Sequence, residues 1–275
     1  MKILRQSIFS IFAAGLLLSS CMKAKEDAIQ DTEMLVASTI IDMAYEMDFS
    51  SGADQSAQNN SYHSSIEAES PNPLPCATIT VETANDGGFP RTFTVDFGTG
   101  CEYNGITRSG ILVITLSNYF MSPGSHMTIE RQNYSMNDWN IAGSVHFVNE
   151  TTDANMPQWT RSTSNSVFTS PVGLSYTSVV NRTVRQIEGY GNLDLNDNVY
   201  EISSGTHTVT KNNGSSITIN ILSPIIKAMD CEYLSTGIMH VNGELLNGDI
   251  DYGEGECDNK AIYTHHNGLT FTINL

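Results

Sequence analysis

Hydrophobic and polar residues alternate over long stretches of this chain, and a period of two is typical of β-strands. Clear examples are residues 92–97, 111–116, 217–221 and 270–275, in which valine, isoleucine, threonine and aromatic residues dominate. Five Asn-Gly pairs lie between such runs and favour tight hairpin turns. We therefore predict one all-β domain over residues 76–275, an antiparallel meander that forms either a sandwich or a curved, barrel-like sheet.

A different period precedes this domain. Between Asp27 and Asp48, apolar residues recur at spacings of three, four and seven, which is the period of one helical face. Acidic residues such as Asp42 and Glu46 supply much of the polar remainder. The pattern predicts an amphipathic helix, either a spacer or packed on the domain, or else docked to a partner. From Ser50 to Pro75 the chain is rich in Ser, Asn, Ala and Pro without periodicity, which predicts a flexible tether.

The first 20 residues have the pattern of an export signal. Lys2 and Arg5 precede an uncharged apolar run, residues 8–18, of about 11 residues, whereas a membrane-spanning helix needs roughly 20. Leu18-Ser-Ser-Cys21 resembles the lipobox of bacterial lipoproteins, in which cleavage precedes the cysteine and its thiol takes up a lipid. We expect residues 1–20 to be removed and Cys21 to anchor the chain to a membrane. The alternative is an ordinary cleavable signal with a chance cysteine.

The charge of the chain limits its partners. The full sequence has a formal net charge of −17, and loss of Lys2 and Arg5 leaves 11 basic against 30 acidic residues, or −19. Such a negative field repels phosphates, so we do not expect nucleic acid as a partner. The expected partner is a protein or a carbohydrate. Lys25-Glu26-Asp27 resembles the surface-export signal of Bacteroidota lipoproteins, although it also fits a plain charged linker. The expected location is the outer membrane, facing the periplasm or the cell surface.

The two ends of the predicted domain carry a repeated unit. Each unit begins with a cysteine, continues as strand, loop and strand, and closes with Asp-aromatic-Gly-x-Gly and a second cysteine. The units are Cys76 to Cys101 and Cys231 to Cys257, with separations of 25 and 26 residues. In a hairpin, the two ends of each unit lie side by side, at the distance that a disulfide needs. We therefore predict the disulfides 76–101 and 231–257, which form in an oxidising compartment. The alternative, a zinc site made by the four cysteines, is less favoured because the sequence lacks Cys-x-x-Cys spacing.

These features together resemble a known group of proteins. The lipobox, the run Phe89 to Cys101 and the closing segment Asp251 to Ala261 are similar to a family of Bacteroidota lipoproteins. The resemblance covers most of the chain from Cys76 onward. It implies a location in the cell envelope and carries no activity, so it assigns no functional residues.

Two groups of acidic side chains offer a further metal-binding hypothesis, for calcium. One group lies at Asp194 and Asp197, and a second group is Asp249, Asp251, Glu254, Glu256 and Asp258. Dense oxygen ligands suit Ca²⁺, which takes six to eight of them, but acidic residues are also ordinary in solvated loops. Asp96 and Asp251 hold equivalent places before Gly-x-Gly, and we expect both to accept backbone N–H bonds.

Sequence motifs of enzymes are mostly missing. The chain has no Gly-x-Ser-x-Gly, no His-Glu-x-x-His and no phosphate-binding glycine loop. We therefore favour a non-catalytic binding or structural role in the envelope. The alternatives are a glycan-handling surface enzyme, with Trp139 or Trp159 beside paired carboxylates, and a calcium-binding adhesion module.

Overall fold

The computed structural model describes residues 32–60, 76–84, 88–163, 165–191 and 196–275. The described residues form one helix, α2 (Thr32–Asn60), and fifteen strands. The strands are β1 (Thr78–Thr83), β2 (Arg91–Asp96), β3 (Cys101–Tyr103), β4 (Ile106–Leu116), β5 (His126–Met136), β6 (Trp139–Asn149), β7 (Gln158–Ser162), β8 (Ser166–Thr169), β9 (Ser175–Glu188), β10 (Val199–Lys211), β11 (Ser216–Ala228), β12 (Thr236–Gly243), β13 (Asn247–Glu254), β14 (Lys260–His265) and β15 (Thr270–Asn274). The predicted signal, Cys21, Asp194 and residues 61–75 lie outside the described residues.

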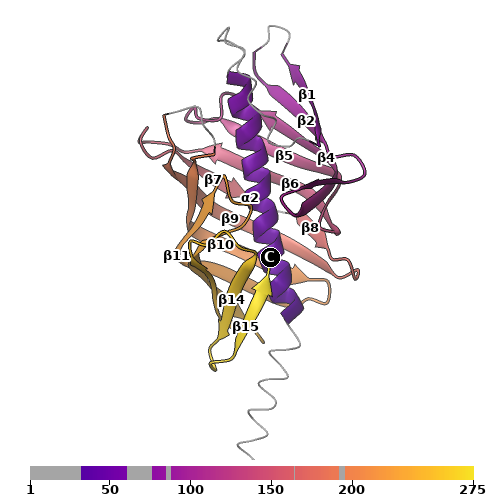
Figure 1. The fold of residues 1–275 in the computed structure, drawn as a ribbon, viewed down its shortest axis with the longest axis vertical. Coiled ribbons are helices and arrows are strands. Elements are labelled where there is room, and N and C mark those ends of the chain that lie inside the picture. Colours follow the sequence, from indigo (N-terminus) through magenta and orange to yellow (C-terminus); the bar gives the residue numbers. More distant parts are fainter. Residues whose placement is uncertain (1–31, 61–75, 85–87, 164, 192–195) are drawn as a thin grey trace, which may run out of the picture.

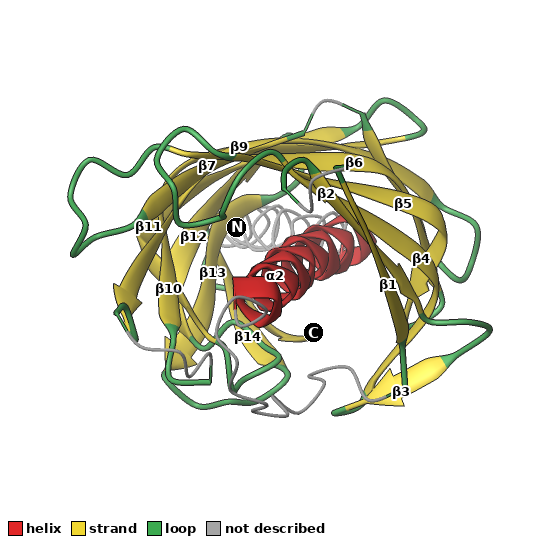
Figure 2. Ribbon diagram, turned by 90° about the horizontal axis from the view of Figure 1, so that it is seen from above, coloured by secondary structure: helices red, strands yellow, loops and turns green. Residues whose placement is uncertain are grey.

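All fifteen strands belong to one antiparallel sheet, which confirms the predicted fold class. The main path runs in sequence order from β1 to β15; β3 pairs with β4, and β8 extends β7 between β6 and β9. Figure 2 shows that this sheet curls around α2 instead of folding into two facing layers. Of the two predicted arrangements, the curved sheet is therefore the observed one. Strands β1 and β15 are the two ends of the path.

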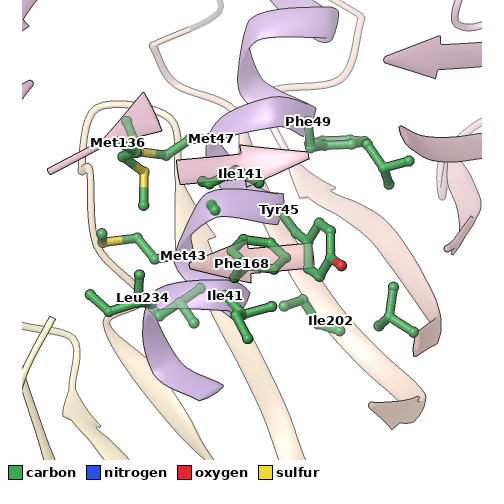
Figure 3. Close-up of a cluster of buried hydrophobic side chains, with 14 of the residues drawn as sticks. Ile41, Met43, Tyr45, Met47, Phe49, Met136, Ile141, Phe168, Ile202 and Leu234 are labelled. Atoms are coloured by element: carbon green, nitrogen blue, oxygen red, sulfur yellow. The ribbon is translucent and has the colours of Figure 1, made fainter. Parts of the chain in front are cut away.

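Helix α2 occupies the hollow of the sheet (Figures 1 and 2). Between Met34 and Ser56 its side chains are buried on all sides, apart from Val36 and Ser50, which are half-buried. Tyr45 and Phe168, for example, meet edge to face with ring centroids 5.7 Å apart (Figure 3). The helix therefore packs within the domain, and a spacer outside it or a docked partner helix does not describe it.

Two details of the predicted N-terminal segment are wrong. The helix continues to Asn60, so residues 50–60 are helical and are not part of a tether. The helix is also not amphipathic, because polar residues such as Ser38, Asp42 and Glu46 are as buried as the apolar ones. A surface helix needs a solvated polar face, whereas a helix enclosed by a sheet does not.

Glycines permit the sharp bending of the long strands. Gly205 has a φ of 109° at a bulge in β10, where the register shifts between Ile202 and Ser204. A Cβ atom at Gly205 would lie 2.1 Å from the carbonyl oxygen of Asn181 on β9. Any side chain would therefore force these two strands apart. Bulges of this kind increase the local twist, and the sheet curls where they occur.

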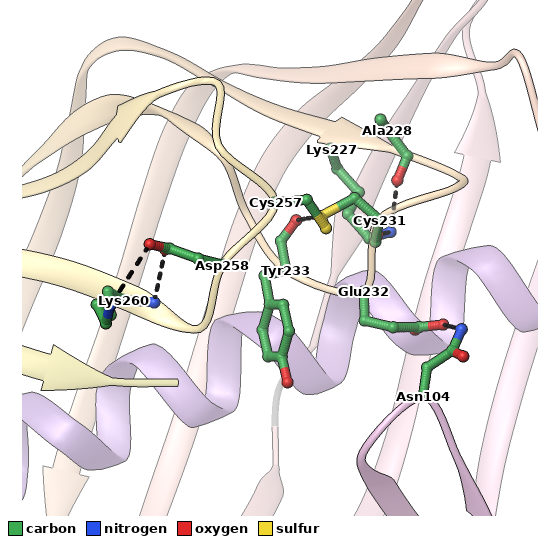
Figure 4. Close-up of a disulfide and its surroundings, with 9 residues drawn as sticks. All are labelled: Asn104, Lys227, Ala228, Cys231, Glu232, Tyr233, Cys257, Asp258 and Lys260. Atoms are coloured by element: carbon green, nitrogen blue, oxygen red, sulfur yellow. Dashed lines mark hydrogen bonds and ion pairs between the residues drawn. A yellow bond between two sulfur atoms is a disulfide. The ribbon is translucent and has the colours of Figure 1, made fainter.

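The two repeated units form disulfide-closed hairpins, as predicted. Cys76 is bonded to Cys101 and Cys231 to Cys257, with Cα atoms 5.5 and 5.7 Å apart. β1 pairs with β2 in the first unit, and β12 pairs with β13 in the second. The β3–β4 turn, which follows the first unit, touches the second unit, because Asn104 Nδ2 donates to Glu232 Oε1 over 3.0 Å (Figure 4).

The Asn-Gly pairs have two different roles. Three of them form hairpin turns, after β3, β10 and β14. The other two, Asn242-Gly243 and Asn247-Gly248, lie at the strand ends that flank the β12–β13 turn. Gly248 is needed there for a different reason, since a Cβ atom would lie 2.2 Å from the Thr264 carbonyl oxygen.

Among the described residues, no helix combines the length and the hydrophobicity needed to cross a bilayer.

Candidate functional site: the charged interior

The concentration of charge inside the domain is its most unusual feature. Asp42, Glu46 and Asp48 of α2 are each 1% exposed. Each carboxylate meets an arginine from a different strand whose side chain is also buried. The pairs are Asp42 with Arg182 of β9, Glu46 with Arg161 of β7, and Asp48 with Arg131 of β5. Burying a carboxylate costs several kcal/mol unless it is paired, so these arginines make the helix compatible with the interior.

The strands aim these arginines inward by simple alternation. In β9, Val180, Arg182 and Val184 share one face, and all three are buried. In β7, Trp159 and Arg161 share the buried face in the same way. Residues two apart in a strand point to the same side. An arginine in phase with core residues therefore faces the helix, where a carboxylate of α2 neutralises its charge.

The three carboxylates do not share one environment. Burial alone raises the pKa of Asp42, but the charge of Arg182 and the interaction with His207 outweigh it and hold the pKa at about 2. For Asp48, burial outweighs the charge of Arg131, and the pKa of the carboxyl lies above its usual value. Two groups thus partner Asp42, whereas Asp48 depends mainly on Arg131. Asp42 is the firmly ionised member of the set.

A chain of close polar contacts links Asp42 to Tyr45 through two strands. His207 Nδ1 of β10 lies 2.9 Å from Asp42 Oδ1, and His207 Nε2 lies 2.8 Å from Ser178 Oγ of β9. The hydroxyl of Tyr45 donates to Ser178 Oγ over 2.8 Å. Burial lowers the pKa of His207, although Asp42 raises it in part. With its proton on Nδ1, a neutral His207 turns that nitrogen toward the Asp42 carboxylate and accepts from Ser178 Oγ at Nε2.

This order of groups matches the arrangement of a serine nucleophile, a histidine base and an orienting aspartate. The surroundings do not match. Ser178 and His207 have no exposed surface, and the Ser178 oxygen already accepts a hydrogen bond from Tyr45. Asp42 belongs to the same helix that covers Ser178. Withdrawing α2 to admit a substrate would therefore remove the aspartate, so the relay is suited to holding the helix.

The polar interior is only partly satisfied. Among the described residues, Glu46 Oε2, Asp48 Oδ1 and Arg161 Nη2 have no hydrogen-bond partner. A buried polar atom without a partner costs about 1–3 kcal/mol. The arrangement therefore specifies where α2 lies more than it adds to stability.

A second cluster surrounds the following turns of the helix. Burial raises the pKa of Asp54 to about 7, although Arg108 and Lys227 lower it. Arg108 Nη1 donates to Ser51 Oγ over 3.0 Å. Lys227 Nζ donates to the carbonyl oxygens of Ala228, over 2.7 Å, and Cys231. Lys227 thus joins the end of β11 to the first cysteine of the second disulfide hairpin (Figure 4).

The predicted calcium ligands are not brought together among the described residues. Asp251 Oδ1 accepts from the N–H of Gly253, Glu256 Oε2 from that of Glu254, and Asp258 Oδ1 from that of Lys260. Asp249 pairs with His240 over 2.7 Å, and Asp197 lies far along the chain, in the β9–β10 loop. No group of three or more His, Cys, Asp or Glu side chains in the described ranges is arranged to hold a metal.

Other candidate residues have structural positions. Asp96 Oδ1 accepts from Gly98 N over 2.8 Å, and Asp251 does the same toward Gly253 over 2.9 Å, which confirms the turn role. Trp159 is buried and stacks on Phe120 at 4.6 Å, so it belongs to the core and is no platform for a sugar.

Sequence reasoning missed the arginines, His207 and Ser178. The signal for the arginines was their phase with core residues in the strands. Their partners on the helix were read as a solvated face. Comparison with protein-family models, curated proteins and solved structures finds no match to this chain.

Proposed function

We propose that this chain is a lipoprotein of the bacterial outer membrane, anchored through Cys21, whose domain has a binding or structural role without catalysis. The observation that carries this proposal is the use of its five cysteines. Four of them form two disulfides. Disulfides form outside the reducing cytoplasm, and the remaining cysteine stands at the lipobox position. Both facts agree with an exported chain that carries a lipid.

The interior supports a non-catalytic role. Its best-ordered polar groups hold α2 in the sheet, and Ser178 is enclosed by the helix that supplies Asp42. Catalysis needs a reactive group that a substrate can reach. The domain is therefore proposed to act through its outer surface, toward a protein or a carbohydrate. Nucleic acid is disfavoured by the formal net charge of −17.

Lipidation can be tested directly. The wild-type chain and a Cys21→Ser variant are expressed in a bacterium that processes lipoproteins and grown with an alkyne-tagged palmitate. We expect the wild type to take up the label, to remain with membranes in high salt and to begin at residue 21. The Cys21→Ser variant should take up no label and should leave the membrane fraction. A wild-type chain that retains Met1, or that takes up no fatty acid, would overturn the proposal.

The side of the membrane is a separate measurement. Intact cells are treated with a protease that cannot enter the periplasm, and the remaining full-length chain is measured. Digestion in intact cells would place the domain on the cell surface. Protection in intact cells, followed by digestion after the outer membrane is opened, would place it in the periplasm.

A further inference from the structure

The position of the first turn of α2 defines one edge of the domain. Glu33 forms an ion pair with Lys211, the last residue of β10. The helix thus starts beside the β10–β11 turn, and the β14–β15 hairpin lies at the same end of the molecule (Figure 1). In an antiparallel meander, every second turn lies at the same edge. We call the turns 170–174, 212–215, 244–246 and 266–269 the near rim.

The turns at the other ends of strands β6 to β14 form the opposite edge. They surround the later part of α2, where Phe49 contacts Phe120 and Asp54 lies close to Lys227. We call the turns 150–157, 189–198, 229–235 and 255–259 the far rim.

The two rims differ strongly in charge. The described part of the far rim carries seven carboxylates: Glu150, Asp153, Asp197, Asp230, Glu232, Glu256 and Asp258. The near rim carries one carboxylate, Glu244. The β5–β6 turn, which lies at the same edge but outside the named rim, adds Asp138. The near rim also presents Val172, whose side chain is 81% exposed in the β8–β9 turn. The far rim also presents exposed apolar side chains, Met156 and Tyr190. The two rims are therefore distinguished by charge: one is strongly acidic, whereas the other is nearly neutral.

We infer that the near rim faces the lipid surface and that the far rim points away from it. This inference rests on the proposed lipid at Cys21. Ten residues lie between Cys21 and Thr32, and the fully extended segment from Cys21 to Thr32 spans at most about 40 Å. Thr32 and Asp54 are separated by about 33 Å along the helix axis. Reaching the membrane with the far rim would take nearly the whole extended length of that segment.

Electrostatics favours the same orientation. Outer-leaflet and inner-leaflet surfaces that contain anionic lipids repel carboxylates, and this repulsion extends over about 10 Å at 0.1 M salt. The far rim would bring seven carboxylates into this range, and the near rim brings one. An exposed valine at a turn enters the headgroup region without leaving a charge unsolvated.

The orientation can be measured on the lipidated full-length chain in vesicles of phosphatidylcholine and phosphatidylglycerol. Two variants carry one introduced thiol each, Val172→Cys on the near rim and Thr152→Cys on the far rim. Both positions are exposed, and the native cysteines are either acylated or paired, so each variant is labelled at one site with a fluorophore. Quenching by lipids that carry nitroxide groups then reports the distance from the bilayer.

We expect quenching at residue 172 to be at least about threefold stronger than at residue 152, because the rims are separated by roughly 30 Å. Equal quenching, or stronger quenching at residue 152, would overturn the orientation. Flotation with the vesicles provides the separate check on the anchor. A wild-type chain that fails to float, like the Cys21→Ser control, would overturn the proposed lipidation together with this inference.

Discussion

Arg161 and Arg182 lie directly opposite each other on the paired strands β7 and β9, with both side chains fully buried. Like charges in this relation destabilise a sheet. Here Glu46 and Asp42 of α2 neutralise them. The inner face of the sheet is therefore incomplete without the helix, and the helix is equally dependent on the sheet.

Removing one member of an interior pair should be costly. Arg161→Met leaves Glu46 buried without its partner, and we expect the free energy of unfolding to fall by about 3–5 kcal/mol. The double variant Glu46→Met/Arg161→Met removes both charges and should recover most of this loss. Urea denaturation followed by circular dichroism measures both changes.

The matched control is the pair of Arg185 and Glu201, whose side chains are 32% and 14% exposed. Arg185→Met should cost at most about 1 kcal/mol, because solvent screens this pair. Equal losses for Arg161→Met and Arg185→Met would show that the interior pairs do not hold α2.

Asp54 should make the domain less stable as the pH rises. Its pKa is about 7 in the folded chain and 3.8 in a free carboxyl, so its contribution is fully present below pH 3.8 and is lost as the pH approaches 7. Asp54→Asn removes this penalty. We expect it to raise the free energy of unfolding at pH 8 by up to about 4 kcal/mol, with little change at pH 4.

Asp42 should have the opposite effect and make the domain more stable as the pH rises from about 2. Its pKa is lowered to about 2, so its contribution is present above pH 3.8 and is lost as the pH falls through 2. Asp42→Asn should therefore destabilise the chain at neutral pH and have less effect at pH 2. Parallel pH profiles for the two variants would contradict the two environments described for these carboxylates.

The relay through Ser178 should hold the structure and show no reactivity. We expect a fluorophosphonate probe to leave Ser178 unlabelled in the folded chain, because Tyr45 and α2 cover its oxygen. Ser178→Ala should lower the free energy of unfolding by about 1–3 kcal/mol, since it leaves polar atoms of His207 and Tyr45 unpaired. Mass spectrometry of the treated protein checks the first point. Labelling that is lost in His207→Gln would instead identify a nucleophile.

Each disulfide should add a similar amount of stability. The bonds separate residues 25 and 26 apart, and loops of this size contribute about 3–4 kcal/mol each in the chain-entropy model. We expect Cys231→Ser/Cys257→Ser and Cys76→Ser/Cys101→Ser to lower the unfolding free energy by comparable amounts. Peptide mapping without reduction supplies the control, and a linked peptide that joins Cys76 to Cys231 would contradict both the pairing and the duplicated hairpin.

Much of the sheet could be predicted from local pattern. Alternation gave the strands, and the repeated Asp-aromatic-Gly-x-Gly segments gave the two disulfides, because hairpin geometry is set by residues close in sequence. The curvature could not be predicted in this way. It depends on bulges such as the one at Gly205, whose effect on the path of the sheet appears only when both neighbouring strands are known.

The interior could not be predicted because its parts are far apart in the chain. Asp42 and Arg182 are separated by 140 residues, and each is an ordinary surface residue by composition. An acidic helix with a weak apolar stripe is usually solvated. Only the phase of Arg161 and Arg182 with buried neighbours distinguished their face, and nothing local indicated that a helix would cover it.

The enclosure of α2 also sets an order of events in biogenesis. The helix is the first described element of the chain, but the partners of its three carboxylates lie more than 80 residues downstream, from Arg131 to His207. A chain that crosses a membrane N-terminus first must therefore carry three unpaired carboxylates until β5, β7 and β9 have followed. Such distant contacts are characteristic of slow folding. The sheet can close around α2 only after these strands are available.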